Sequence, residues 1–154
     1  MMLKETALLR MLGAAKIPLI FFCSPKVIEL DSEGCAVKIP LGYRTRNHLG
    51  SMYFGVLCTG ADCAGGLNAF LLIREKYKRV SLVFKDFKAE FLKRADGDVV
   101  FRCRDGRAIA AALEQAQTSG ERVTIPVTIT ATVPDKYGDE PVAQFTLGLS
   151  LKRK

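Results

Sequence analysis

The chain has 154 residues, of which 49% are hydrophobic, and its formal net charge is +7. This length is enough for one domain with a substantial core, and the ordinary apolar fraction excludes a disordered chain. Five cysteines without a CxxC pair argue against a disulfide scaffold and favour reduced thiols in a cytoplasmic protein. Because His48 is the one histidine, a histidine-based metal site or a Ser-His-Asp triad is not expected.

The positive charge is compatible with a nucleic acid, an anionic membrane or a phosphate-bearing small molecule as partner. The basic residues are spread along the chain. They form no cluster interleaved with aromatic side chains, and no helix-turn-helix pattern is present. We therefore expect no nucleic-acid partner, and a solvated basic surface is the simplest interpretation of the charge.

The N-terminal residues favour a helix. Apolar side chains at helical spacing between Leu8 and Ala15 predict an amphipathic helix over residues 1–16, with Pro18 near its end. Charged residues interrupt each apolar run before Ile17, so a signal peptide is not expected.

The next segments predict a β-hairpin and then a long helix. Val27–Leu30 and Ala36–Leu41 flank a turn at Glu33-Gly34. After a polar loop, an apolar helix is expected over Tyr53–Tyr77. It is long enough to span a bilayer, but Asp62 near its middle would cost roughly 2.5–3.5 kcal/mol there. We therefore expect a buried helix of a soluble protein and no stable membrane insertion.

Alternating apolar residues indicate strands in the second half. The alternation over Val80–Phe84 continues over Phe87–Phe91 after a slip of one residue, which predicts a β-bulge. A strand is expected over Val99–Arg104. Asp105 is then predicted to cap a short helix that ends at Ser119-Gly120.

The last third predicts two long strands, over residues 123–133 and 143–151, that form an antiparallel hairpin with one buried face. Pro126 lacks an N–H group, so this strand should lie at or near a sheet edge at that point. Helices do not alternate with strands along the chain, which predicts an α+β fold. A sheet that curls around the long apolar helix would cover it.

The segment Arg46–Gly66 combines a polar loop, a glycine-bearing helix start and an acid two turns into the helix. Free N–H groups at a helix start stabilise an oxyanion or a polarised carbonyl. A carboxylate inside an apolar helix is costly unless it is paired or hydrated. Asp62 therefore either pairs with an arginine or backbone donor, lies on a solvent stripe, or acts as a general base or nucleophile.

The motif Asn47-His-Leu-Gly-Ser-Met-Tyr-Phe-Gly55 resembles the hotdog-fold acyl-CoA thioesterases, and more narrowly their DUF4442-like branch of unknown function. The resemblance covers about residues 25–152. Phenylacetyl-CoA-type thioesterases have an Asn, then His-Gly-Gly, then an acid inside the helix. Asn47, Gly55 and Asp62 match this pattern, whereas Tyr53 stands in place of the His and Phe54 in place of the first Gly.

This resemblance implies a single hotdog domain over residues 1–154, with a helical extension over 1–24 that packs outside the core or covers the acyl entrance. The resemblance also implies a mechanism, in which the thioester carbonyl oxygen accepts the N–H of Phe54 or Gly55. Asp62 of a neighbouring subunit would activate water or attack directly, and Asn47 would position the water or the carbonyl. The expected assembly is a homodimer or a dimer of dimers.

The substrate implied is an acyl-CoA or acyl-carrier thioester, with coenzyme A as part of the substrate and no separate cofactor. Val56 and Leu57 would line the acyl tunnel, and Arg44 or Arg46 could meet the coenzyme A phosphates. His48 is a substrate-side candidate, with a local hydrogen bond in the loop as the alternative.

Two other functions stay open. A non-catalytic acyl- or lipid-binding hotdog protein is favoured by Tyr53, which cannot replace an imidazole, and by Phe54, whose side chain narrows the site. A hydroxyacyl dehydratase is suggested by His48, fourteen residues before Asp62, but the Pro-Gly-rich loop that follows the histidine in those enzymes is missing.

Overall fold

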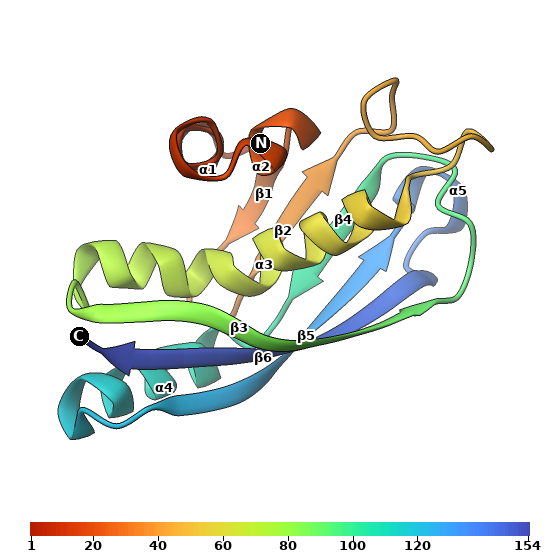
Figure 1. The fold of residues 1–154 in the computed structure, drawn as a ribbon. Coiled ribbons are helices and arrows are strands. Elements are labelled where there is room, and N and C mark those ends of the chain that lie inside the picture. Colours follow the sequence, from red (N-terminus) through yellow and green to blue (C-terminus); the bar gives the residue numbers. More distant parts are fainter.

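The computed structural model describes residues 1–154 (Figure 1). Five helices are present: α1 (Leu3–Lys16), α2 (Pro18–Cys23), α3 (Phe54–Glu75), α4 (Gly106–Ser119) and α5 (Pro134–Tyr137). Six strands are present: β1 (Lys26–Leu30), β2 (Cys35–Ile39), β3 (Val80–Phe91), β4 (Val99–Cys103), β5 (Val123–Thr132) and β6 (Pro141–Arg153). All five cysteines are free thiols.

The strands form one antiparallel sheet in the order β1-β2-β4-β5-β6-β3. Figure 1 shows the sheet curving along α3, with α1 and α2 on the outer side of that helix. The predicted α+β architecture, an antiparallel sheet around one long helix, is therefore confirmed. The hydrophobic core lies between α3, α4 and the concave face of the sheet.

The helix α3 is slightly shorter than predicted, because the chain ahead of Phe54 is extended and the helix ends at Glu75. Its apolar length would suffice to cross a membrane, yet most of it is buried in the domain. A Cβ atom at Gly60 would lie 2.2 Å from the ring of Phe101. The glycine therefore lets the helix approach the sheet closely.

The predicted hairpin of the last third is β5 with β6. Their alternate residues form a buried row against α3 and a polar outer row, in which Thr128 lies opposite Thr146. The strand β4 pairs only with the far half of β5, from Ile129 to Thr132. Pro126 lies outside that pairing, so its missing N–H is not needed there, and the prediction of a local edge is confirmed.

The two edges of the sheet differ. At the β1 edge, the N–H of Met2 donates to the carbonyl of Val27 (2.8 Å), and the N–H of Val27 donates to the Thr6 hydroxyl (2.9 Å). At the other edge, β3 has no neighbour on its outer side. The predicted bulge in β3 is confirmed by a register shift between Phe84 and Phe87. One edge is thus covered by α1, and the longer one is open.

Two local predictions were incomplete or wrong. The N-terminal segment forms two helices rather than one, because Ile17 leaves the helical conformation and Pro18 begins a second helix. Asp105 stands at the N-cap position of α4 but does not cap it. Its carboxylate instead accepts the N–H of Thr128 (2.7 Å), which lies on the half of β5 that β4 does not reach. The predicted helix end at Gly120 is confirmed by its left-handed conformation.

Candidate functional site

The loop before α3 is shaped by Asn47. Its side-chain oxygen accepts the N–H groups of Leu49 (2.8 Å) and Ser51 (3.1 Å). The backbone N–H of Tyr53 then donates to the carbonyl of Thr45 (2.9 Å), which fixes the chain as it enters the helix. This local folding follows from the ability of an Asn side chain to replace backbone acceptors in a turn.

The first turn of α3 presents two free donors. Tyr53 occupies the N-cap position in an extended conformation and offers no side-chain cap. The N–H groups of Phe54 and Gly55 have no acceptor within the chain. Donors of this kind carry the positive end of the helix dipole and favour a partial negative charge on a ligand oxygen. The free N–H groups expected from the sequence are therefore present.

Gly55 allows an aromatic ring to cover this turn. A Cβ atom there would lie 2.6 Å from a ring carbon of Tyr53, so a larger residue would displace the ring. The Tyr53 and Phe54 rings meet edge to face with centroids 4.9 Å apart, and Phe54 contacts Phe91 in the same way at 6.2 Å. Tyr53 is 47% exposed and Phe54 58% exposed. Both rings thus stand at the mouth of the site.

A surface pocket of about 620 Å³, which we call the first-turn pocket, opens beside these residues. Five residues proposed from the sequence line it: Asn47, His48, Tyr53, Phe54 and Leu57. The opposite wall is the segment Phe91–Ala95, which sequence reasoning did not assign to the site. The feature of the sequence that could have identified this wall is the adjacent pair of basic residues, Lys93 and Arg94.

The wall segment is tied to the loop. Arg94 donates to the Ser51 hydroxyl (3.0 Å) and to the carbonyl of Leu49 (3.0 Å). Lys93 pairs with Glu140 at 3.1 Å. The two basic side chains therefore lie at the rim of the first-turn pocket, where an anionic ligand group could reach them.

Asp62 lies elsewhere on the same helix. It is partly buried beside an apolar cavity of about 80 Å³ and has no hydrogen-bond or ion-pair partner in the chain. This Asp62 cavity is also walled by the N-terminal helices and by β3, through Leu9, Leu12, Ile17, Ile20, Leu82 and Phe84. Burial raises the pKa of the Asp62 carboxyl above its ordinary value.

Asp62 and the first turn cannot meet the same small group within one chain. Eight residues separate Phe54 from Asp62, which corresponds to about 12 Å along a helix axis. The two sets of groups also line different pockets. Within the single chain, the structure brings together the helix start, Asn47 and His48, but not the acid.

The remaining predicted residues lie outside the first-turn pocket. Val56 is buried in the core, and Gly55, although it lies in the first turn, does not line the pocket. The guanidinium of Arg44 lies over the Phe22 ring at 5.2 Å, and it donates to the Ser24 hydroxyl. Arg46 lies over the Tyr43 ring at 5.5 Å. The expected contacts of these arginines with coenzyme A stay predictions.

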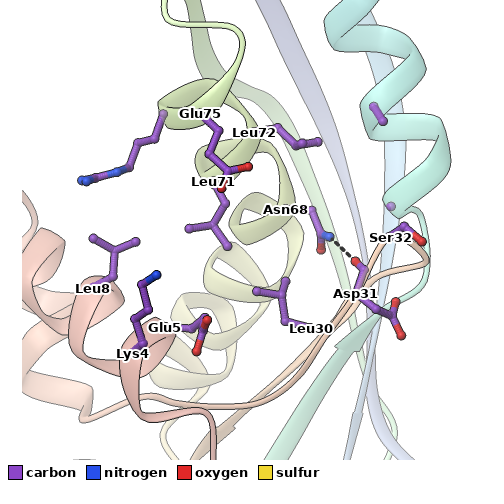
Figure 2. A pocket seen from close by; sticks show the side chains of 13 residues that line it. Lys4, Glu5, Leu8, Leu30, Asp31, Ser32, Asn68, Leu71, Leu72 and Glu75 are labelled. Atoms are coloured by element: carbon purple, nitrogen blue, oxygen red, sulfur yellow. Dashed lines mark hydrogen bonds between the residues drawn. The ribbon is translucent and has the colours of Figure 1, made fainter.

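A further groove of about 540 Å³ lies near the other end of α3 (Figure 2). Its walls come from α1, the β1–β2 turn, α3 and α4. The buried Asn68 side chain donates to the carbonyl of Asp31 (3.0 Å), while its own oxygen has no partner. No sequence motif pointed to this groove.

Comparisons with known proteins now bear on this geometry. A family model described as a domain of unknown function, DUF4442, matches residues 5–147. No curated protein matches the chain. A Pseudomonas aeruginosa protein of unknown function, described as a probable thioesterase, is similar in structure (TM-score 0.77) at 24% identity, over 97% of this chain and 96% of that chain.

Two further solved structures are similar at lower identity. A thioesterase from Haemophilus influenzae has a TM-score of 0.65 at 15% identity, over 93% of this chain and 88% of its own. A thioesterase family protein from Silicibacter pomeroyi has a TM-score of 0.67 at 19% identity, over 97% and 99%. At such low sequence identity, the structural similarity establishes a shared fold. With the family match over nearly its whole length, the chain belongs to the DUF4442 family and has the hotdog fold of the thioesterases.

Proposed function

We propose that the protein hydrolyses acyl thioesters, with an acyl-CoA or an acyl-carrier thioester as the substrate. The observation that carries this proposal is the pair of free N–H groups in the first turn of α3, on Phe54, which lines the first-turn pocket, and on its neighbour Gly55. Donors fixed in this way match the oxygen of a thioester carbonyl and stabilise the oxyanion formed when it is attacked. The hotdog fold, which the chain shares with thioesterases, supports the same assignment.

Each site is completed by a second copy of the chain. The open strand β3 runs past both parts: Leu82 and Phe84 line the Asp62 cavity, and Phe91 contacts Phe54. Antiparallel pairing of two β3 edges about their midpoints would bring the first half of one strand beside the last residues of the other. Asp62 of one subunit would thereby approach the first turn of its partner. A long unpaired edge strand also favours pairing with another chain.

The chemistry needs one water and one base. Water attacks the thioester carbonyl carbon, and the Asp62 carboxylate accepts a proton from that water. The oxyanion is held by the N–H groups of Phe54 and Gly55. When it collapses, the carbon–sulfur bond breaks, and the leaving thiolate takes up the proton that Asp62 accepted, which restores the Asp62 carboxylate. A carboxyl pKa raised by burial makes Asp62 a stronger base than an exposed aspartate.

The first-turn pocket would hold the coenzyme A side of the substrate. Lys93 and Arg94 rim this pocket, whereas Arg44 and Arg46 rest on aromatic rings outside it. Charge-assisted contacts to phosphate would therefore come first from Lys93 and Arg94. His48 lines the same pocket and is a further candidate contact.

A non-catalytic acyl-binding protein is the second candidate. The exposed rings of Tyr53 and Phe54 favour it, because they narrow the opening at the place where a thioester would enter. The hydroxyl of Tyr53 can donate a hydrogen bond to a carbonyl but cannot shuttle a proton as an imidazole does at neutral pH.

The decisive experiment measures free-thiol release from a panel of acyl-CoA thioesters by the wild type and by Asp62→Asn. Hydrolysis by the wild type and a loss of about 100- to 10,000-fold in the variant are expected if Asp62 is the general base. Absence of turnover on every chain length would refute hydrolysis and favour the binding protein. Full activity in Asp62→Asn would remove Asp62 from the mechanism. An enoyl-CoA hydration assay on the same samples tests the dehydratase alternative.

A further inference from the structure

The two N-terminal helices, with the residue that joins them, expose large apolar side chains. Six such residues are between 42% and 71% exposed, and we call them the N-terminal face: Leu3, Met11, Ile17, Leu19, Phe21 and Phe22. The opposite side of the same helices is already packed, since Leu9, Ile20 and Cys23 are buried. Exposed apolar side chains gathered in this way indicate an interaction surface.

The position of these helices leaves the face accessible. Figure 1 shows α1 and α2 on the outer side of α3, where α1 also covers the β1 edge of the sheet. The face is also distinct from the open β3 edge that we assign to dimer formation. A partner could therefore contact the N-terminal face while the sheet edge is occupied.

The charges around this face are mostly positive. The first 24 residues contain three basic side chains (Lys4, Arg10 and Lys16) against one acid, Glu5. Lys4 and Glu5 both line the groove between α1 and α3 (Figure 2), and Arg10 donates to the carbonyls of Ser24 and Pro25. Lys16 is exposed directly before Ile17, and Arg44 lies over the Phe22 ring at 5.2 Å. Exposed Phe and Leu side chains bordered by Lys or Arg are typical of segments that lie in a membrane interface.

We propose that the N-terminal face docks the protein on an anionic lipid bilayer, with the apolar side chains in the acyl region and the cations at the headgroups. A second copy of the chain fits this face less well, because two cationic surfaces would oppose each other. Docking of this kind is peripheral and leaves α3 in the core. The proposal does not depend on hydrolysis. If the proposed activity is also correct, docking would hold the Asp62 cavity, which α1 and α2 cover, close to the source of long acyl chains.

The test is co-sedimentation of the full chain with vesicles of phosphatidylcholine alone and of phosphatidylcholine mixed with phosphatidylglycerol. We expect binding to the mixed vesicles, weak binding to the neutral ones, and loss of binding at high salt. Lys16→Glu should weaken binding to the mixed vesicles by about fivefold per unit of charge changed. The double variant Leu19→Ser/Phe22→Ser should weaken it by roughly tenfold or more.

Matched controls come from residues outside both the N-terminal face and the β3 edge. Leu49, Leu92 and Lys78 are exposed, so Leu49→Ser/Leu92→Ser and Lys78→Glu make the same kinds of chemical change elsewhere on the surface. Both should bind vesicles as the wild type does, and equal melting temperatures establish that all variants are folded. Failure of the wild type to sediment with the mixed vesicles would overturn the proposal. A lower molar mass for Leu19→Ser/Phe22→Ser in light scattering, without an effect on vesicle binding, would also overturn it and assign the face to a second copy.

Discussion

The two parts of α3 to which we assign catalytic roles differ in their surroundings. The first turn opens into a pocket of about 620 Å³ and presents unpaired N–H donors next to exposed aromatic rings. Asp62, two turns further along, lies beside an apolar cavity of about 80 Å³ under the N-terminal helices. The first turn is thus an open site with unpaired donors, whereas Asp62 is a partly buried carboxylate without a partner in the chain.

This difference explains how a short chain can hold free N–H donors and a free carboxylate, which would otherwise bind each other. A carboxylate placed at the first turn would accept hydrogen bonds from the free N–H groups and cap the helix. The donors would then be unavailable to a ligand, and the carboxylate would be a weaker base. Separation along the helix keeps the donors free and keeps the pKa of Asp62 raised. Dimer formation through β3 would then bring the two parts together between subunits.

The largest effect is expected from a variant that tests whether the first turn of one subunit acts with Asp62 of the other. Phe54→Pro removes one donor while Pro suits both the first helical position and the extended Tyr53 before it. Alone, it should lower hydrolysis about 100- to 1,000-fold, as for loss of an oxyanion donor. Co-expressed with Asp62→Asn, it should recover about a quarter of wild-type activity, because half of randomly paired dimers keep one intact site of two.

Phe54→Ala is the matched control, because it keeps the N–H group and removes the ring. It should retain hydrolysis, or increase it if the ring narrows the opening. Mixed dimers without recovered activity, or a wild type that is strictly monomeric in light scattering, would contradict the shared site.

A smaller effect concerns the loop that supports the first turn. Asn47→Ala removes an acceptor used by the N–H groups of Leu49 and Ser51, and should lower the free energy of unfolding by about 1–3 kcal/mol. We expect a concurrent loss of activity of roughly tenfold, because the pocket wall loses its shape. Asn47→Asp keeps the acceptor and should restore both properties in urea unfolding and thiol-release assays. A stable but inactive Asn47→Asp would instead assign the side-chain NH₂ group to substrate contact.

The smallest effect concerns the cost of the isolated carboxylate. Because burial raises the folded-state pKa of Asp62 above the unfolded value, this group destabilises the fold progressively as the pH rises above the unfolded-state pKa, and the loss is complete above the raised pKa. Asp62→Asn should therefore melt a few degrees higher than the wild type at neutral pH. This difference in melting temperature should vanish as the pH falls below the ordinary carboxyl pKa of 3.8, because Asp62 is then uncharged in both the folded and the unfolded protein.

Asp139→Asn is the control for this measurement, since Asp139 is exposed and its substitution should leave the melting temperature unchanged. A lower melting temperature for Asp62→Asn at neutral pH would mean that the carboxylate has a stabilising partner, as a paired aspartate would.

The amino-acid sequence by itself determined the elements that depend on local periodicity. The alternation in the last third predicted β5 and β6 with the correct buried face, and the slip after Phe84 predicted the bulge in β3. The motif from Asn47 to Gly55 located the start of α3 and its free donors. These features depend on the spacing of residues that are close together in the chain, and this spacing can be read from the sequence.

Only the tertiary structure decided what depends on contacts between distant segments. Asp105 was predicted to cap α4, but the chain brings the unpaired N–H of Thr128 within 2.7 Å of it, and that bond takes the carboxylate. Likewise, no local pattern showed that Phe91–Ala95 walls the first-turn pocket, or that α1 and α2 cover Asp62. The physical reason is that burial and pairing are properties of the folded neighbours of a residue, and these neighbours lie tens of residues away in the sequence.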